Sequence, residues 1–244
     1  AIFLAWETRA EVPLLPLRII LDRTRGGAFL ASLLVGVGLF GSFLFLTFYF
    51  QGTLGYTPLQ AGLAALPVTL GVLIGAGIAS TLLPRIGARP MMIVGPIIAG
   101  AAMFSLSRLG VQTSFAAHLL PAEIVLGIGM GLVFVPMASL ALVGVSNNDA
   151  GAASAVLNAT QQVGGSLGTA LLNTIATTAT ANYLASHLPP TQQIGAEAAV
   201  AGYTTAFAWG AGIIALAAVA VAVLVRAGKD EVASVPLVPI ADPA

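Results

Sequence analysis

Six long apolar stretches occupy most of the chain and restrict its fold more than any other feature. They are, approximately, Gly26–Phe50, Pro58–Leu83, Met91–Leu109, Phe115–Val143, Gly151–Thr178 and Val200–Val225. Each is close to the roughly 20 residues that a helix needs to cross the hydrocarbon core of a bilayer. Backbone polar groups in hydrocarbon must be paired within the segment, which favours helices over the short alternating strands of a barrel. The sequence therefore predicts an all-α membrane protein with six transmembrane helices.

The composition excludes several classes of protein. Only 7% of the residues are charged, against about 25% in soluble domains. The net charge is zero, so no basic field would hold nucleic acid and we expect no nucleic-acid partner. The chain has no Cys and two His, so we expect no metal site. It also has neither a phosphate-binding loop nor a nucleophile elbow, so we expect no cofactor and no enzyme activity.

The positive charges predict an orientation. Six spans place eight of the nine cations on one side and leave only Arg108 on the other; the eight are Arg9, Arg18, Arg23, Arg25, Arg85, Arg89, Arg226 and Lys229. The cation-rich side of a membrane protein is normally cytoplasmic. We expect a multi-pass protein of the bacterial cell membrane, with both ends of the six-helix unit in the cytoplasm.

We divide the chain into three parts. Residues 1–25 are predicted to be the end of a preceding helix and a cytoplasmic link, because the chain starts with Ala1 and runs straight into an apolar stub. Residues 26–226 are predicted to form the six-helix transmembrane bundle. Residues 227–244 mix charges with prolines, and we expect a disordered cytoplasmic tail.

A polar stripe runs along the fifth apolar stretch. Its side chains recur every three or four residues and therefore share one helical face. Such a face is costly in lipid, so it either ties helices together or lines a water-filled cavity, and its length favours the cavity. We expect Asn158, Gln162 and Asn173 to line this cavity, with Gln51 as a weaker candidate. The other candidates on the stripe are Gln161 and Thr169.

Small residues accompany this stripe. Gly164, Gly165 and Gly168 lie beside it, and Gly127 and Gly131 form a small-xxx-small pair in the fourth apolar stretch. Glycines at this spacing let two helix backbones approach closely. We expect these five residues to pack helices together, and a second interpretation makes them a pivot for rocking.

Glu123 is the one acid well inside a predicted span. Carboxylates within membranes are rare, costly and usually functional. We assign Glu123 to proton coupling. Two alternatives remain open, a carboxylate that reaches the outer interface and a hydrogen bond between helices. His118 lies five residues earlier, off the same face, and we interpret it as interfacial.

Aromatic residues gather near the end of the first apolar stretch, at Phe43, Phe45, Phe48 and Phe50. Aromatic belts are common at membrane interfaces. An alternative is that some of these rings wall an apolar substrate pocket.

Three segments together resemble a known family. They are Tyr49–Pro67, Arg85–Pro90 and Asp149–Gly168. The combination looks like the C-terminal half of a major facilitator superfamily transporter, and is similar to the fourteen-helix drug/proton antiporter branch. Within it, Arg85, Gly87 and Arg89 match the cytoplasmic loop motif, although Pro84 stands where that motif usually has an acid.

The resemblance implies a secondary transporter that exports small amphipathic compounds in exchange for protons. The six spans would be the last six of fourteen, with Trp6–Arg25 as the link from the eighth helix to the ninth. The partners would be a missing N-terminal transmembrane half and the lipid bilayer, with the substrate site between the two halves.

Two other functions remain open. One is an uptake carrier of the same superfamily, and the other is a non-transporting six-helix scaffold or accessory protein. The polar stripe separates the scaffold from the half-transporter. A self-contained bundle would bury the stripe among its six helices, whereas half of a transporter would leave it on an open face.

Overall fold

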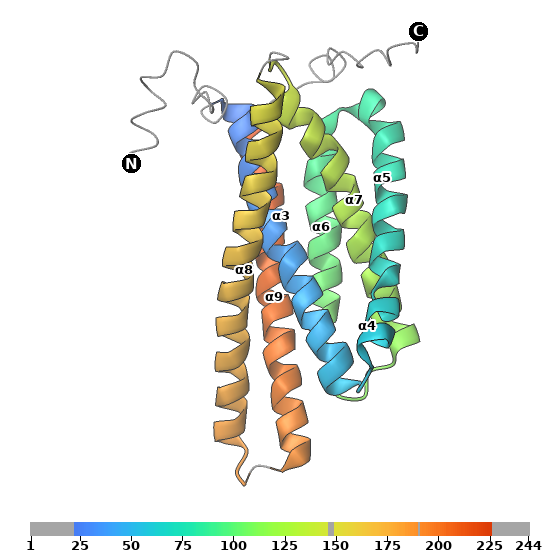
Figure 1. Cartoon of the computed structure of the whole chain (residues 1–244), viewed down its shortest axis with the longest axis vertical. Helices are drawn as coiled ribbons and strands as arrows, with labels where there is room; N and C mark the ends of the chain where they lie inside the picture. Colours follow the sequence, from blue (N-terminus) through green and yellow to red (C-terminus); the bar gives the residue numbers. More distant parts are fainter. Residues whose placement is uncertain (1–21, 146–148, 190, 226–244) are drawn as a thin grey trace, which may run out of the picture.

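The computed structural model describes residues 22–145, 149–189 and 191–225, which are almost entirely helical (Figure 1). The predicted tail, and the predicted link except residues 22–25, lie outside this part of the chain. The elements, in chain order, are α3 (Arg23–Phe48), η1 (Tyr49–Thr53), α4 (Pro58–Ala64), α5 (Leu66–Ile86), α6 (Ala88–Leu106), η2 (Phe115–Leu119), α7 (Leu120–Leu142), α8 (Ala150–Ser186) and α9 (Gln192–Leu224). The short elements η1 and η2 are π-helical turns.

Each predicted span coincides with one long helix or with two consecutive helices. Five of these segments are long and apolar enough to cross a membrane: Arg23–Thr53, Pro58–Ile86, Ala88–Leu106, Phe115–Leu142 and Gln192–Leu224. This confirms the predicted all-α membrane fold. The remaining helix, α8, has 37 residues but does not belong to this apolar set, because its polar stripe lowers its hydrophobicity.

Local sequence signals explain where several helices begin. The Asp22 carboxylate accepts a hydrogen bond from the Arg25 backbone N–H at 2.9 Å, which caps α3 three residues earlier than the predicted span. Thr57 and Gln60 form a reciprocal capping box at the start of α4. Side-chain oxygens at these positions satisfy N–H groups that have no partner inside the helix.

A single glycine separates α5 from α6. Gly87 has φ +79°, a conformation that side chains rarely adopt, and it ends one helix and begins the next. The connection between the predicted spans that end at Leu83 and begin at Met91 is therefore a one-residue turn, because Pro84 lies in the last turn of α5 and Pro90 in the first turn of α6.

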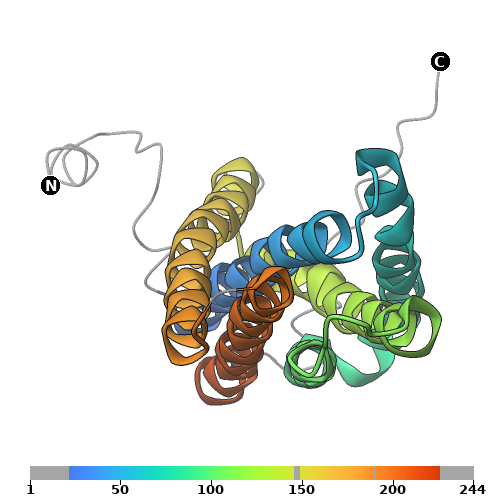
Figure 2. The ribbon, with the colours of Figure 1, turned by 90° about the horizontal axis from the view of Figure 1, so that it is seen from below.

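The helices form a bundle with one helix near its middle. Seen along the bundle, α3 lies between α8 at the left and α5 at the right, and α9 and α6 lie on the lower side of the view (Figure 2). The largest buried side chains come from α3, η1, α6, η2, α7 and α9. By contrast, in an apolar 18-residue window of each segment, only 22% of the residues are buried in Pro58–Ile86, against 61% in Arg23–Thr53. Helix α5 is thus held by one side only.

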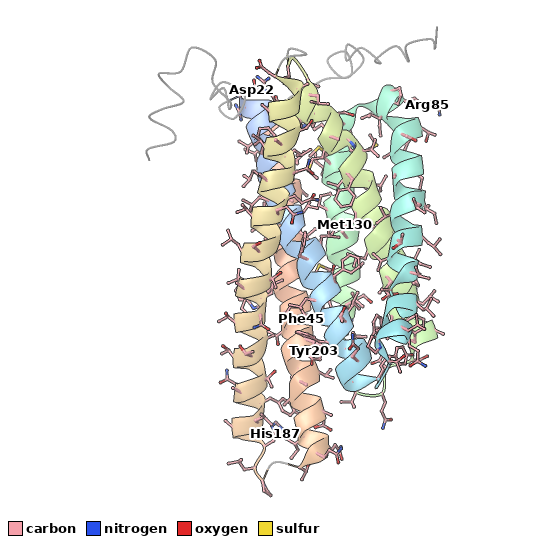
Figure 3. The ribbon with its side chains drawn as sticks, in the orientation of Figure 1. Asp22, Phe45, Arg85, Met130, His187 and Tyr203 are labelled. Carbon is pink, nitrogen blue, oxygen red and sulfur yellow. The ribbon has the colours of Figure 1, made fainter. Side chains whose placement is uncertain are left out.

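Ionisable residues mark the two ends of the bundle. Asp22 and Arg85 lie at one end and His187 at the other (Figure 3). At the Asp22 end, the Arg23 guanidinium donates to the Val223 carbonyl oxygen at 2.9 Å. The Val223 carbonyl lies in the last turn of α9, where cations complement the helix dipole.

Candidate functional site

A groove runs between α3 and α8, with a volume of about 550 Å³. One wall comes from α3 and is apolar, formed by Phe40, Leu44 and Phe48. The other wall comes from α8 and carries small and polar residues: Gly165, Ser166, Thr169, Ala170 and Asn173. We call this the α3–α8 groove. Its two walls differ in chemistry, which is the arrangement that an amphipathic molecule would fit.

A second pocket continues the groove toward α9. It has a volume of about 370 Å³ and shares Phe48 and Asn173 with the α3–α8 groove. Its ring-bearing wall includes Phe45 and Tyr203, whose ring centroids are 6.1 Å apart (Figure 3). Its α8 wall includes Thr177 and Thr180. The two spaces therefore form one continuous surface along α8.

A third pocket, of about 330 Å³, lies between α3, α7 and α8. Asn158 and Gln161 of the predicted stripe line it, together with Phe134 and Met137 of α7. The structure therefore divides the predicted cavity residues between two neighbouring places. Asn158 and Gln161 line this pocket, while Thr169 and Asn173 line the α3–α8 groove.

Two of the predicted cavity residues are placed differently. Gln162 and Gln51 are exposed, but neither is among the residues that line these three pockets. Gln51 lies in η1, beyond the end of α3.

The structure adds residues that the sequence interpretation missed. Ser166 and Thr180 extend the polar wall. A signal for them was present in the spacing of the polar residues along this helix. Steps of three or four residues connect Asn158, Gln162, Ser166, Thr169, Asn173, Thr177 and Thr180.

The hydroxyls of the polar wall donate to their own helix. Ser166 Oγ donates to the Gln162 carbonyl at 3.0 Å, Thr169 Oγ1 to the Gly165 carbonyl at 2.7 Å, and Thr177 Oγ1 to the Asn173 carbonyl at 2.9 Å. A serine or threonine hydroxyl has one donor and two acceptor lone pairs. Once the donor is used within the helix, the hydroxyl has only acceptor capacity left for another molecule.

The polar stripe is not buried within the bundle. Asn158, Gln162, Asn173 and Thr177 are all exposed. The buried positions of α8 are others, mostly Gly and Ala, with Leu172 among them. Helix α8 therefore packs on the bundle mainly through small residues, and these four polar side chains remain exposed.

Glu123 lies in the first turn of α7 and is fully buried. Among the residues that the structure describes, neither carboxyl oxygen has a hydrogen-bond partner. Gly127, one turn later on the same face, packs on Val68 of α5. By the same register, Glu123 lies level with the break between α4 and α5 at Ala65. His118 is exposed in η2.

The predicted packing glycines all lie at helix contacts. A methyl group at Gly127 would overlap the Val68 carbonyl oxygen, and one at Gly131 would overlap the Val72 carbonyl oxygen, both in α5. In α8, the corresponding neighbours belong to α3: Gly164 abuts Leu33, Gly165 abuts Phe40 and Gly168 abuts Val37. The pairs α5–α7 and α3–α8 therefore meet through backbone, with little side chain between them.

The two arginines of the loop motif have different surroundings. The Arg89 guanidinium donates to the Ala222 carbonyl oxygen of α9 at 2.8 Å. Arg85 is exposed in the last turn of α5, and Gly87 forms the turn between them. Arg23 and Arg89, from two different helices, thus both bind the carboxyl end of α9.

Comparison with known proteins identifies the family. Residues 5–169 match the model of the Major Facilitator Superfamily. The chain belongs to the major facilitator superfamily. Its all-helical bundle is consistent with half of a major facilitator fold, and the family is one of integral membrane transporters.

Several similar proteins carry names that describe drug resistance or export. The puromycin resistance protein pur8 of Streptomyces alboniger is 44% identical over 240 residues, which cover 96% of this chain and 47% of the relative. The cephamycin export protein CmcT of Amycolatopsis lactamdurans is 35% identical, over 76% of this chain and 39% of the relative. A multidrug resistance protein B homolog of Mycobacterium tuberculosis is 31% identical, over 69% and 32%. The chain thus spans less than half the length of these relatives.

Proposed function

We propose that this chain forms the C-terminal six-helix half of a proton-coupled drug exporter of the fourteen-helix branch. The observation that carries the proposal is the exposed polar stripe of α8. Asn158, Gln162, Asn173 and Thr177 are exposed although they lie on a helix of a membrane bundle. Polar faces at membrane depth need another protein surface or water. An N-terminal half that faces α8 across a solvated path would supply both.

The relatives support export as the direction of transport. Their names describe puromycin resistance and cephamycin export. We propose amphipathic compounds as the substrate class, because the α3–α8 groove pairs an apolar wall with a polar one. The open stripe favours this function over the self-contained scaffold, whose stripe would lie among its own helices.

In this proposal the end of the bundle that holds Arg23, Arg25, Arg85 and Arg89 faces the cytoplasm of a bacterial cell. Alternating access comes from rocking of this bundle against the N-terminal half. The glycine contacts of α3 with α8 and of α5 with α7 would let these pairs slide during the motion.

Glu123 is the proposed proton-coupling residue. Burial of an ionised carboxylate without a partner is costly, whereas the neutral acid is tolerated more easily. The fully buried side chain and its lack of a hydrogen-bond donor suit a carboxyl group that holds a proton in this conformation. A second conformation that admits water to the α4–α5 break would release it.

Efflux measurements test the proposed function. Bacterial cells without their own exporters would express the full-length protein that carries this chain, and the loss of a fluorescent amphipathic dye would be followed. We expect dye efflux that stops when the proton gradient is collapsed. Asn173→Leu should slow efflux at least several-fold, because it removes the amide shared by two pockets. Efflux that is indistinguishable from the empty vector would overturn the proposal.

Glu123→Gln tests the proton role separately. This variant keeps the shape and removes the titrating group. We expect downhill dye movement to persist while uphill, gradient-driven efflux and its pH dependence are lost. Gradient-driven efflux with an unchanged pH profile would exclude Glu123 from coupling.

A further inference from the structure

We infer that the α3–α8 groove selects cargo that carries N–H or O–H hydrogen-bond donors next to an apolar ring system. This inference rests on the proposed function and names its substrate class more narrowly. The evidence is the direction of the hydrogen bonds along the polar wall, together with the composition of the wall that faces it.

The polar wall presents acceptors. Ser166, Thr169 and Thr177 have each used their one donor on a carbonyl of α8, at 2.7–3.0 Å. Asn158, further along the same stripe, also donates through Nδ2 to the Ser154 carbonyl at 3.0 Å. What the three hydroxyls offer to a bound molecule is the lone pairs of their oxygens, whereas Asn158 keeps its amide oxygen and one N–H. Asn173, between Thr169 and Thr177, adds an amide to the same row, with an oxygen that accepts and an NH2 group that donates.

The spacing makes these acceptors a continuous row. Residues 166, 169, 173 and 177 are separated by three or four positions, so their side chains lie one above another on the helix. At 1.5 Å per residue, the row extends over about 16 Å. A cargo molecule with one or two donors can therefore bind at several heights, which suits a groove that accepts many compounds.

The opposite wall sets the second requirement. Phe40, Leu44 and Phe48 offer no polar atom, and Phe40 and Phe48 are exposed. Exposed rings gain by stacking on planar apolar groups. No charged side chain is among the described residues that line this groove, so this half of the pathway recognises donors by hydrogen bonding and not by ion pairing.

Desolvation makes the selection effective. Water hydrates the wall oxygens when the groove is empty. A cargo without donors would displace that water and leave the acceptors unpaired, at the cost of a buried acceptor without a hydrogen bond. The difference in binding free energy between a molecule with a donor and one without is usually larger than the contribution of the hydrogen bond alone.

Two probes that differ only in their donors test the inference. One is a planar aromatic dye with primary amino groups, and the other is the same dye with each amino group dialkylated. Both transport by cells expressing the full-length protein and equilibrium binding to the purified protein are measured. Thr169→Val keeps the branched shape and removes the acceptor. Thr178→Val is the matched control, since Thr178 donates to the Thr174 carbonyl in the same way but does not line the groove.

We expect the native protein to prefer the amino dye, and Thr169→Val to reduce that preference about two- to tenfold, the range for loss of one neutral hydrogen bond. Thr178→Val should leave the preference unchanged. Equal preference in the native protein and in Thr169→Val would overturn the inference even where both dyes are transported. If the purified protein binds the amino dye better than the dialkylated dye but cells transport neither, the inferred selectivity of the groove would be supported and the proposed function would be overturned.

Discussion

Tyr49 illustrates how a single polar atom is accommodated in the apolar core. Its side chain is fully buried, and its hydroxyl donates to the Gly110 carbonyl oxygen at 2.6 Å. We expect Tyr49→Phe to destabilise the bundle by about 1–3 kcal/mol, because the Gly110 carbonyl loses its donor. The melting temperature in detergent measures this loss.

Tyr56→Phe is the matched control for that measurement. The Tyr56 ring stacks on Phe50 with centroids 5.9 Å apart, and in the described part of the chain its hydroxyl makes no side-chain hydrogen bond. Its melting temperature should stay close to that of the native protein. A Tyr49→Phe variant as stable as the control would show that the hydroxyl bond contributes nothing.

Individual site residues were predictable where helical periodicity determines their position. The spacing of Thr169 and Asn173 placed them on one polar face, and both line the α3–α8 groove. Phe40 was not predictable, because its role depends on the path of α3 beside α8, which no spacing within one segment reveals. Gln51 was selected as an amide near a span end, and it lies in η1 outside the three pockets.

At the scale of elements, the glycine contacts hold α5 on α7. A Cβ at Gly127 would overlap the Val68 carbonyl and lie 2.8 Å from the Gly71 Cα. We expect Gly127→Ala to destabilise the protein by about 1–3 kcal/mol, the usual cost of an overpacked core. Gly77→Ala, in α5 and with open space around it, is the control. Thermal unfolding of both variants gives the comparison, and equal melting temperatures would refute close packing.

The two arginines at the end of α9 lead to another expectation. Loss of the Arg89 contact should loosen the last turn of α9, because a cation there complements the exposed carbonyls. In Arg89→Ala, amide hydrogen exchange at 221–225 should accelerate about two- to fivefold. Arg85→Ala, which removes an exposed arginine of the same loop, should leave this exchange unchanged. Equal exchange in the two variants would contradict the contact.

The elements themselves followed closely from the apolar pattern, because the membrane imposes one length and one secondary structure on each span. The breaks did not. The interruption at Ala65 depends on Pro67 two residues later, and the one-residue turn at Gly87 depends on backbone geometry. A proline in the sequence indicates that a helix can be interrupted there, but not whether it is. Pro96 and Pro136, for example, lie inside the continuous helices α6 and α7.

For the whole molecule, the central expectation is that α8 faces water while the outer face of α9 meets lipid. These 244 residues contain no Cys, so a single cysteine introduced here is the one thiol of this segment. We expect Asn173→Cys to react with a water-soluble maleimide in membranes, and Leu216→Cys, although 56% exposed, to react only with a lipid-soluble reagent. Leu172→Cys, fully buried, should resist both. Equal labelling of the first two positions would contradict the assignment of faces.

The backbone contacts between α5 and α7 also have a genetic consequence. Every glycine codon begins with two guanines, and any single-base change at either of them replaces glycine with a larger residue or a stop codon. Gly71, Gly75, Gly127 and Gly131 each lack room for even a methyl group. Two thirds of the single-base changes in these codons should therefore disturb the helix pair. In a library of random point mutants selected for stable protein, base changes that replace these four glycines should be depleted, whereas synonymous changes should persist.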